Sequence, residues 1–243
     1  MSRTPSPRAN GSSGEESVPG RQRRCPGGVK GLLIGCLLLG GCSLPRPRIA
    51  YATPEYRPEN VFLYAPEFAP DVKRVALLPL ACADRSPELR DGCEALTPVV
   101  EAELVKIRKF EVVSASPEIL RKCTGRSAWT GAESLPQNFF DVLREAYGCD
   151  AVLFCQLTTF RPYEPLAVGL RMKLVSTRTG QTLWAVDELL DAGRQSVLNG
   201  ARQYQSARLQ GSYDGCGDWL VRNSPRMFGQ YAAAQMLATL PKR

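Results

Sequence analysis

The sequence predicts a single α/β domain, α+β-like in layout, in which a mixed sheet of about five strands carries packed helices. Three observations predict this class. Short apolar runs alternate with segments of helical periodicity, in the order β-α-β-α-α-β-β-β-α-α. Two of the strands are joined by a short turn typical of a hairpin. The composition, 44% hydrophobic and 23% charged over 243 residues, is sufficient for one sizeable core.

The first half of the domain is predicted to contain two strands and three helices. Residues 72–80 (VKRVALLPL) end as a nearly continuous apolar run, which is typical of a strand covered on both faces. Ser116 followed by Pro117 marks the start of a short helix, because serine caps helices and proline fits their first turn. Ahead of the domain we expect a short strand at 61–64. Within it we expect, in chain order, a strand at 72–80, a helix at 94–108, a strand at 110–113, and helices beginning near 116 and 135.

The second half is predicted to be three consecutive strands followed by two helices. Residues 166–177 alternate, with Val168, Leu170 and Met172 on one side. The turn at 177–180 leads into a strand in which Trp184 is expected to lie in the core. In order, we expect strands at 151–160, 166–177 and 182–186, and helices at 195–210 and 224–240.

Ahead of this domain, a basic flank, a short apolar run and a cysteine follow one another. The run at 31–41 (GLLIGCLLLGG) is shorter than the roughly 20 residues of a membrane-spanning helix and fits a secretory signal. It ends in Leu39-Gly40-Gly41-Cys42, which resembles the lipobox of bacterial lipoprotein signal peptides. That resemblance implies cleavage before Cys42 and acylation of its thiol. Cys36, inside the apolar run, is the weaker alternative.

Acylation at Cys42 would divide the chain into three parts. We expect a signal peptide with a disordered basic leader at 1–41, a lipidated, proline-rich tether at 42–70, and a globular periplasmic domain at 71–243. Two or more acyl chains anchor a protein stably to membrane lipid, at about 0.8 kcal/mol per buried CH₂. Lipoprotein sorting in Gram-negative bacteria retains proteins with aspartate after the lipidated cysteine in the inner membrane. Ser43 therefore points to the periplasmic face of the outer membrane.

Six of the nine cysteines lie after Cys42. An even number in an exported domain permits disulfides, in 15 connectivities that the sequence does not distinguish. Cys82 and Cys93 bracket a polar loop and are the best-motivated pair. The chain has no histidine and no CxxC pair, so we expect neither a metal site nor a cofactor.

The predicted strands also carry motifs of a known family. Residues 72–80, FEVVSAS at 110–116, YGCDAVLFCQLTTF at 147–160 and VGLRMKLVSTRTGQTLWAV at 168–186 follow in order. This arrangement resembles the periplasmic domain of the curli-secretion lipoprotein family and of related lipoproteins that activate penicillin-binding proteins. The resemblance covers roughly residues 73–187, and its motifs are structural. It implies a fold and, by analogy, an envelope protein as partner.

Charge and residue types argue against nucleic-acid binding and against catalysis. Residues 1–42 hold four of the seven net positive charges, and the remainder is scattered without a basic stripe. Without histidine the usual proton shuttle is missing. Asp187 and Glu188 are adjacent in a strand, so they point to opposite faces and cannot act as a pair. We therefore expect no catalytic residues and no nucleic-acid partner.

The side chains expected to make protein contacts are of the types that contribute most to interfaces. The sequence thus predicts a lipid-anchored, non-enzymatic component of the cell envelope that binds a protein. A subunit of an oligomeric outer-membrane secretion or export complex, including a homo-oligomer, and a periplasmic enzyme of unknown reaction stay open as alternatives. The candidate interaction residues are Arg161, Tyr163, Arg202, Tyr204 and Trp219.

Overall fold

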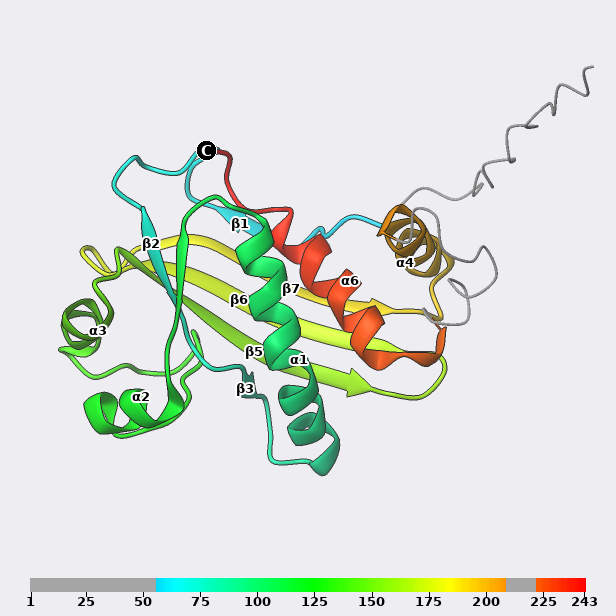
Figure 1. Ribbon diagram of the computed structural model, residues 1–243, viewed down its shortest axis with the longest axis horizontal. Helices are drawn as coiled ribbons and strands as arrows, with labels where there is room; N and C mark the ends of the chain where they lie inside the picture. The colour runs from blue at the N-terminus through cyan, green and yellow to red at the C-terminus, as the bar shows by residue number, and fades with distance from the viewer. Residues whose placement is uncertain (1–55, 209–221) are drawn as a thin grey trace, which may run out of the picture. The chain divides into compact units, whose positions relative to one another are not determined.

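The computed structural model describes residues 56–208 and 222–243, and it confirms the predicted fold class: a mixed sheet with helices packed on it (Figure 1). Cys42, the signal segment and Trp219 lie outside the described residues. The strands are β1 (Val61–Leu63), β2 (Arg74–Leu77), β3 (Ala81–Cys82), β4 (Glu111–Ser114), β5 (Ala151–Arg161), β6 (Ala167–Ser176) and β7 (Thr182–Asp191). The helices are α1 (Pro87–Lys106), α2 (Pro117–Thr124), α3 (Phe139–Tyr147), α4 (Gln195–Arg208) and α6 (Pro225–Leu237).

The seven strands form one sheet in the order β1-β7-β6-β5-β2-β4, with β3 beside β5. Strands β2, β4 and β5 run parallel, whereas β5, β6, β7 and β1 pair antiparallel. The predicted hairpin joins β6 to β7, and Gly180 in its turn has a φ of 69°, which glycine adopts at little steric cost. The short strands β1 and β4 are the two edges.

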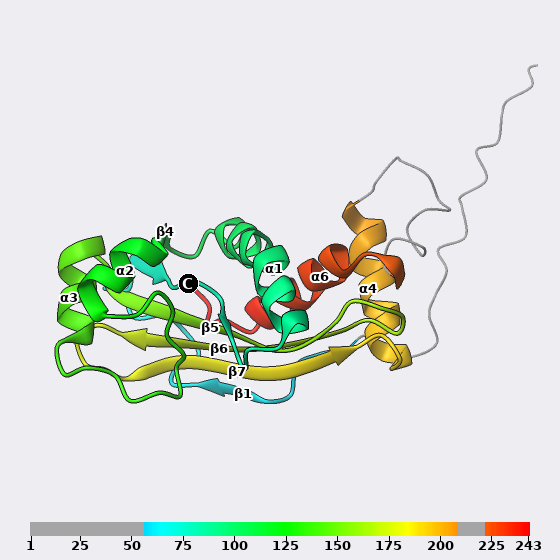
Figure 2. The same ribbon diagram turned by 90° about the horizontal axis from the view of Figure 1, so that it is seen from below.

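One face of the sheet is covered by α1 and α6 (Figure 2). The alternation predicted for β6 turns Leu170, Met172 and Leu174 toward these helices, and Trp184 of β7 is fully buried beside them. The two helices approach closely at Gly229, where any Cβ would collide with Leu96. This face holds the main core, as the periodicity of the last helix predicts.

The opposite face is covered over only part of its area. Helices α2 and α3 pack against Val152 and Phe154 of β5, and Phe139 of α3 stacks on the Phe154 ring with centroids 5.9 Å apart. Helix α3 ends at Gly148, as predicted, with a φ of 60°. Beyond this smaller core, strand residues on this face are only partly buried or are exposed. This part of the sheet is called the open face below.

Helix α1 begins earlier than the apolar stripe predicts, at 87 instead of 94. The Ser86 hydroxyl accepts a hydrogen bond from the backbone N–H of Leu89 at 3.4 Å, and Pro87 occupies the first turn. Between Cys82 and Cys93, residues 83–86 are therefore an irregular loop, and residues 87–92 are the first turns of α1. Strand β2 ends at Leu77, two residues ahead of Pro79, which has no N–H to donate to a sheet.

Described residues on the N-terminal side of residue 71, where the sequence pattern predicts the globular domain to begin, also join the sheet. Strand β1 pairs with β7 through Phe62↔Ala185. Tyr56 is buried, and its hydroxyl donates a 2.7 Å hydrogen bond to Glu188. Residues 56–70 therefore belong to the same fold, because their strand and their aromatic ring complete one margin of the sheet.

Candidate interaction surface

The open part of the sheet carries a polar row that crosses three strands. Gln156 of β5, Arg171 of β6 and Asp187 of β7 are cross-strand neighbours. The Arg171 guanidinium donates to the Asp187 carboxylate at 2.7 Å from Nε, and a second nitrogen, Nη2, lies 2.6 Å from the same oxygen. Asn60, just before β1, donates from Nδ2 to the Asp187 backbone carbonyl at 3.1 Å. The row therefore joins four consecutive segments of the sheet.

A second, mostly apolar row runs alongside it. Phe154, Lys173, Ala185 and Phe62 are successive cross-strand neighbours from β5 to β1. The Lys173 ammonium donates to the backbone carbonyl of Gly131 at 3.0 Å, so the loop after α2 forms one wall. Between the rows is a cavity of about 170 Å³. Phe62 is 51% exposed and forms the opposite rim.

The two acidic residues at this surface are each engaged by protein partners. Among the described residues that line the cavity, Asp187 is the one carboxylate and is paired with Arg171, and none is a cysteine or a serine. Glu188, its neighbour in β7, accepts hydrogen bonds from Tyr56 and from the backbone of Glu59 and Asn60. Burial alone would raise the pKa of Glu188, but these hydrogen bonds outweigh it and lower that pKa. The two acids thus have separate partners, as the strand alternation predicts.

Two of the predicted interaction residues lie at the turn between β5 and β6. Arg161 ends β5, where its Nη2 forms a 2.9 Å ion pair with Asp191 of β7 and its Nε donates to the Pro165 carbonyl. Tyr163, in the turn itself, is 79% exposed. Arg161 therefore braces the hairpin, whereas Tyr163 is free to contact a partner.

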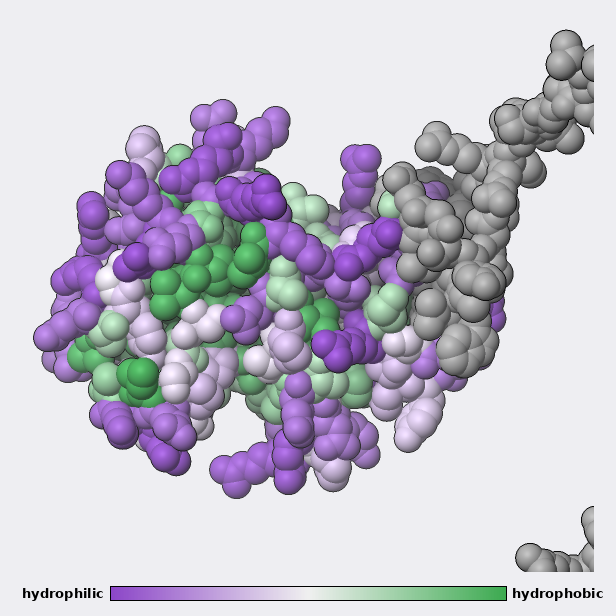
Figure 3. Space-filling model, viewed as in Figure 1, coloured by the Kyte–Doolittle hydropathy of each residue, from purple (hydrophilic) through white to green (hydrophobic). Residues whose placement is uncertain are grey.

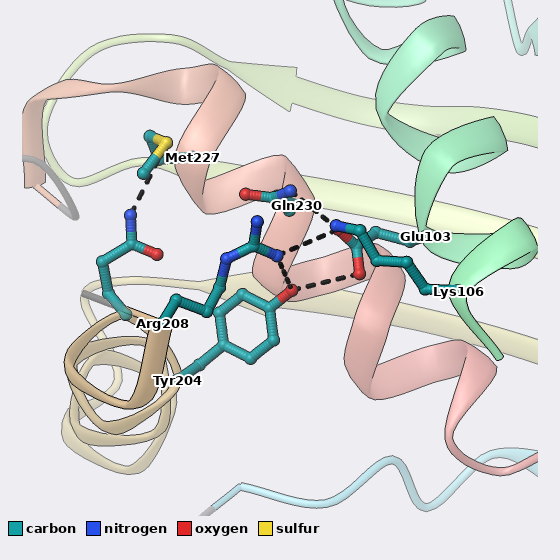
Figure 4. A network of polar contacts seen from close by, with 7 residues as sticks. Glu103, Lys106, Tyr204, Arg208, Met227 and Gln230 are labelled. Atoms are coloured by element: carbon teal, nitrogen blue, oxygen red, sulfur yellow. Dashed lines mark hydrogen bonds and ion pairs between the residues drawn. The ribbon is translucent and has the colours of Figure 1, made fainter. Parts of the chain in front are cut away.

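Tyr204 and Arg202 lie on α4, away from that turn. The Tyr204 hydroxyl donates to Glu103 of α1 at 3.1 Å and accepts from Arg208 at 3.0 Å (Figure 4). Arg202 is half-buried, and its Nη1 lies 3.5 Å from the Asn199 side-chain oxygen. Tyr204 thus belongs to a network that fastens α4. The four predicted residues that the structure describes lie in two separate places, at the β5–β6 turn and on α4.

Glu103 is the centre of that network. It is buried between α1, α4 and α6 and also accepts a hydrogen bond from Gln230 at 2.7 Å and pairs with Lys106. Desolvation by burial on its own would raise the pKa of Glu103. The hydrogen bonds from Lys106, Gln230 and Tyr204 lower it by more, so the net pKa lies below the ordinary glutamate value. The carboxylate therefore stays ionised and holds the three helices together.

The predicted disulfide is present: Cys82 of β3 and Cys93 of α1 are bonded, with their Cα atoms 6.3 Å apart. Among the described residues the free cysteines are Cys123, which is exposed, and Cys149 and Cys155, which are buried. No group of histidine, cysteine or acidic residues in the described ranges is arranged to hold a metal ion.

Sequence reasoning missed the open face and its cavity. A signal was available, because β6 alternates and Arg171 and Lys173 occupy its outward positions in the middle of an apolar strand. The hairpin register then sets Asp187 opposite Arg171. Asn60 and Phe62 belong to a short strand whose pairing partner only the folded chain reveals.

Seen from the side of α1 and α6, apolar side chains gather within a mostly polar surface (Figure 3). The exposed large apolar residues in the described helices include Val105 near the end of α1 and Ile119 of α2. In the part of the chain that the structure describes, no helix has the length and apolar content to cross a membrane.

Neither a protein-family model nor a curated protein sequence matches this chain. Several solved structures are similar to it at low identity. The PelC dodecamer from Paraburkholderia phytofirmans is 13% identical, with a TM-score of 0.45, over 75% of this chain and 97% of that one. Lipoprotein GNA1162 from Neisseria meningitidis is 17% identical, with a TM-score of 0.39, over 57% and 97%. The LpoB C-terminal domain from Escherichia coli is 17% identical, with a TM-score of 0.32, over 49% and 82%.

Proposed function

We propose that this chain is a lipid-anchored protein of the bacterial cell envelope whose domain binds a protein partner and catalyses no reaction. The observation that carries the proposal is the Leu-Gly-Gly-Cys sequence ending at Cys42, fourteen positions ahead of Tyr56, the first residue that the structure describes. Acylation there would hold the domain close to a membrane. Ser43 favours the periplasmic face of the outer membrane.

The open sheet face supports binding rather than chemistry. It offers a half-exposed aromatic ring, paired charges and a small cavity, which together suit a protein contact. A catalytic centre would instead need an acid, base or nucleophile free to react with a substrate. The carboxylate at this face is already engaged by Arg171.

The anchor is tested by the intact mass of the protein purified from the membranes of a Gram-negative host. The expected species starts at Cys42, carries added acyl mass and is lighter by two hydrogens for each disulfide. The Cys42→Ser variant should lose the acyl mass and leave the membrane fraction. An unmodified Cys42 in a chain that retains the apolar run would refute the proposal.

Partner binding is tested with a photo-reactive amino acid in place of Phe62 in living cells. We expect cross-links from this position to a single protein, identified by mass spectrometry. The matched control is the same photo-reactive residue at Glu94, an exposed position on α1. Cross-links to a second copy of this chain would favour the alternative, a subunit of an oligomeric export complex. Equal labelling from both positions would argue against binding at the open face.

A further inference from the structure

The cavity on the open face has the size of one aromatic ring. Its volume is about 170 Å³, and an apolar protein cavity of about 150 Å³ is known to accommodate benzene. Its walls include the rings of Phe62 and Phe154 and the methyl group of Ala185. Aromatic rings pack favourably against one another in edge or offset geometry, so the cavity favours an aromatic occupant over an aliphatic one.

One hydrogen-bond acceptor at the cavity has no partner. Gln156 lines the cavity, and its Oε1 is buried without a hydrogen bond. A buried acceptor left unpaired costs free energy that a suitable donor recovers. The terminal torsion of glutamine has a broad, shallow profile, so the amide can turn toward an occupant at little cost. A ring with an O–H or N–H donor therefore fits better than a plain phenyl ring.

The charges that line the cavity are unequal. Arg171 and Lys173 contribute two positive charges, and Asp187 contributes one negative charge. The Asp187 carboxylate forms an ion pair with Arg171. The Lys173 ammonium instead donates to the neutral backbone carbonyl of Gly131. The rim therefore carries one uncompensated positive charge on a half-buried lysine, and an acidic residue next to the inserted ring would complement it.

From these observations we propose that the cavity receives a tyrosine or tryptophan side chain of a partner protein. Its O–H or N–H donates to Gln156, and an adjacent aspartate or glutamate lies against Lys173. This inference rests on the proposed protein-binding function and specifies its recognition site. The ring is the anchor of the contact, since aromatic residues that fill desolvated pockets dominate the energy of protein interfaces.

The experiment uses short peptides as probes and residues 42–243 with Cys42→Ser as the protein. N-acetyl-aspartyl-tyrosine amide is titrated into ¹⁵N-labelled protein and compared with its phenylalanine counterpart and with N-acetyl-lysyl-tyrosine amide. We expect backbone shifts at Gln156, Lys173 and Ala185. We expect about fivefold tighter binding of the tyrosine peptide than of the phenylalanine peptide, the effect of one hydrogen bond. The lysyl peptide should bind more weakly than the aspartyl peptide.

Two substitutions locate the interaction. Gln156→Leu keeps the size of the side chain and removes the acceptor, so the two aromatic peptides should bind equally to it. Ala185→Leu fills the cavity and should abolish the shifts. Leu189→Ala is the matched control, because it is exposed on the same strand outside the cavity, and it should bind as the wild type does.

Equal affinities of the tyrosine and phenylalanine peptides for the wild-type protein would overturn the proposal, as would shifts confined to other surfaces. This comparison needs no variant, so a substitution that unfolds the protein does not affect it. Failure here is distinct from failure of the proposed function, since the acyl mass at Cys42 and the cross-links from residue 62 are measured independently. A partner captured at position 62 without a ring in the cavity would leave the function in place and remove the site.

Discussion

At the scale of single residues, the free thiols differ in reactivity because their burial differs. Cys155 is fully buried, and desolvation raises its pKa to about 12; burial also raises the pKa of Cys149. A thiol of high pKa and no access to solvent holds little reactive thiolate. Cys123 is exposed. In residues 42–243 with Cys42→Ser and Cys216→Ser, we expect a maleimide to label Cys123 within minutes, and Cys149 and Cys155 only after denaturant is added. Rapid labelling of Cys155 in the native protein would contradict the packing.

The bond between Cys82 and Cys93 is a second residue-scale contribution. It closes a loop with a sequence separation of 11 and joins β3 to α1. Chain entropy in the unfolded state then predicts a stabilisation of about 3 kcal/mol. The variant with Cys82→Ala and Cys93→Ala should lose that amount in urea unfolding monitored by circular dichroism. Wild type and variant should become equal in a reducing agent, and a difference that persists there would assign the effect to packing.

At the scale of elements, the Glu103 network attaches α4 to α1 and α6. Glu103→Gln leaves Lys106 and Arg208 without their carboxylate partner. Because the Lys106 side chain is 47% exposed and that of Arg208 is 39% exposed, solvent screens part of the lost electrostatic stabilisation. We expect a destabilisation of about 2 kcal/mol near neutral pH. Amides of α4 should exchange with solvent faster in hydrogen-exchange measurements.

The pH dependence of this effect has a definite sign. The pKa of Glu103 is lower in the folded state than in the unfolded chain, so its stabilisation is complete above the ordinary glutamate pKa. It is lost as the pH falls through the folded-state value. The difference between wild type and Glu103→Gln should therefore shrink below about pH 4.5, the ordinary value for glutamate. Glu94→Gln, an exposed position on the same helix, is the control and should change stability little at any pH.

The elements themselves were largely predictable, because each depends on local pattern. Alternation in β6 and the hairpin turn at Gly180 are local features, and both were predicted. The start of α1 was missed by seven residues because its first two turns, between Ser86 and Cys93, are mostly polar and carry no apolar stripe. The cap formed by Ser86 and Pro87 was the available signal. Strand β7 runs to Asp191, beyond the predicted end, because its pairing with β6 continues there.

The candidate surface depends on tertiary structure, and here the sequence was less informative. Tyr204 was singled out as an interface residue by its type, but its hydroxyl is taken up by Glu103, 101 residues earlier in the chain. The cavity needs β5, β6, β7 and β1 side by side, together with a loop carbonyl from Gly131. No local sequence pattern indicates that part of one sheet face is left without a covering helix. The positions of α2 and α3 in the fold determine how much of that face is covered.

At the scale of the whole molecule, the two possible starts of the domain make different predictions. A chain beginning at residue 56 keeps β1 and the buried Tyr56, whereas one beginning at 71 loses both. Removing β1 exposes the edge of the long strand β7 and leaves Glu188 without its bonds from Tyr56, Glu59 and Asn60.

We therefore expect residues 56–243 to unfold within about 2 °C of residues 42–243 carrying Cys42→Ser. Residues 71–243 should melt about 10 °C lower and tend to aggregate, since a loss of several kcal/mol shifts Tm by that amount in a domain of this size. Differential scanning calorimetry measures both, and size-exclusion chromatography detects the aggregation. Tyr56→Phe in the longer chain separates the two causes, because it removes the hydrogen bond to Glu188 and leaves β1 in place. If the chain starting at 71 were as stable as the longer one, residues 56–70 would be a tether after all, and the rim that Phe62 gives the cavity would not be part of a fixed surface.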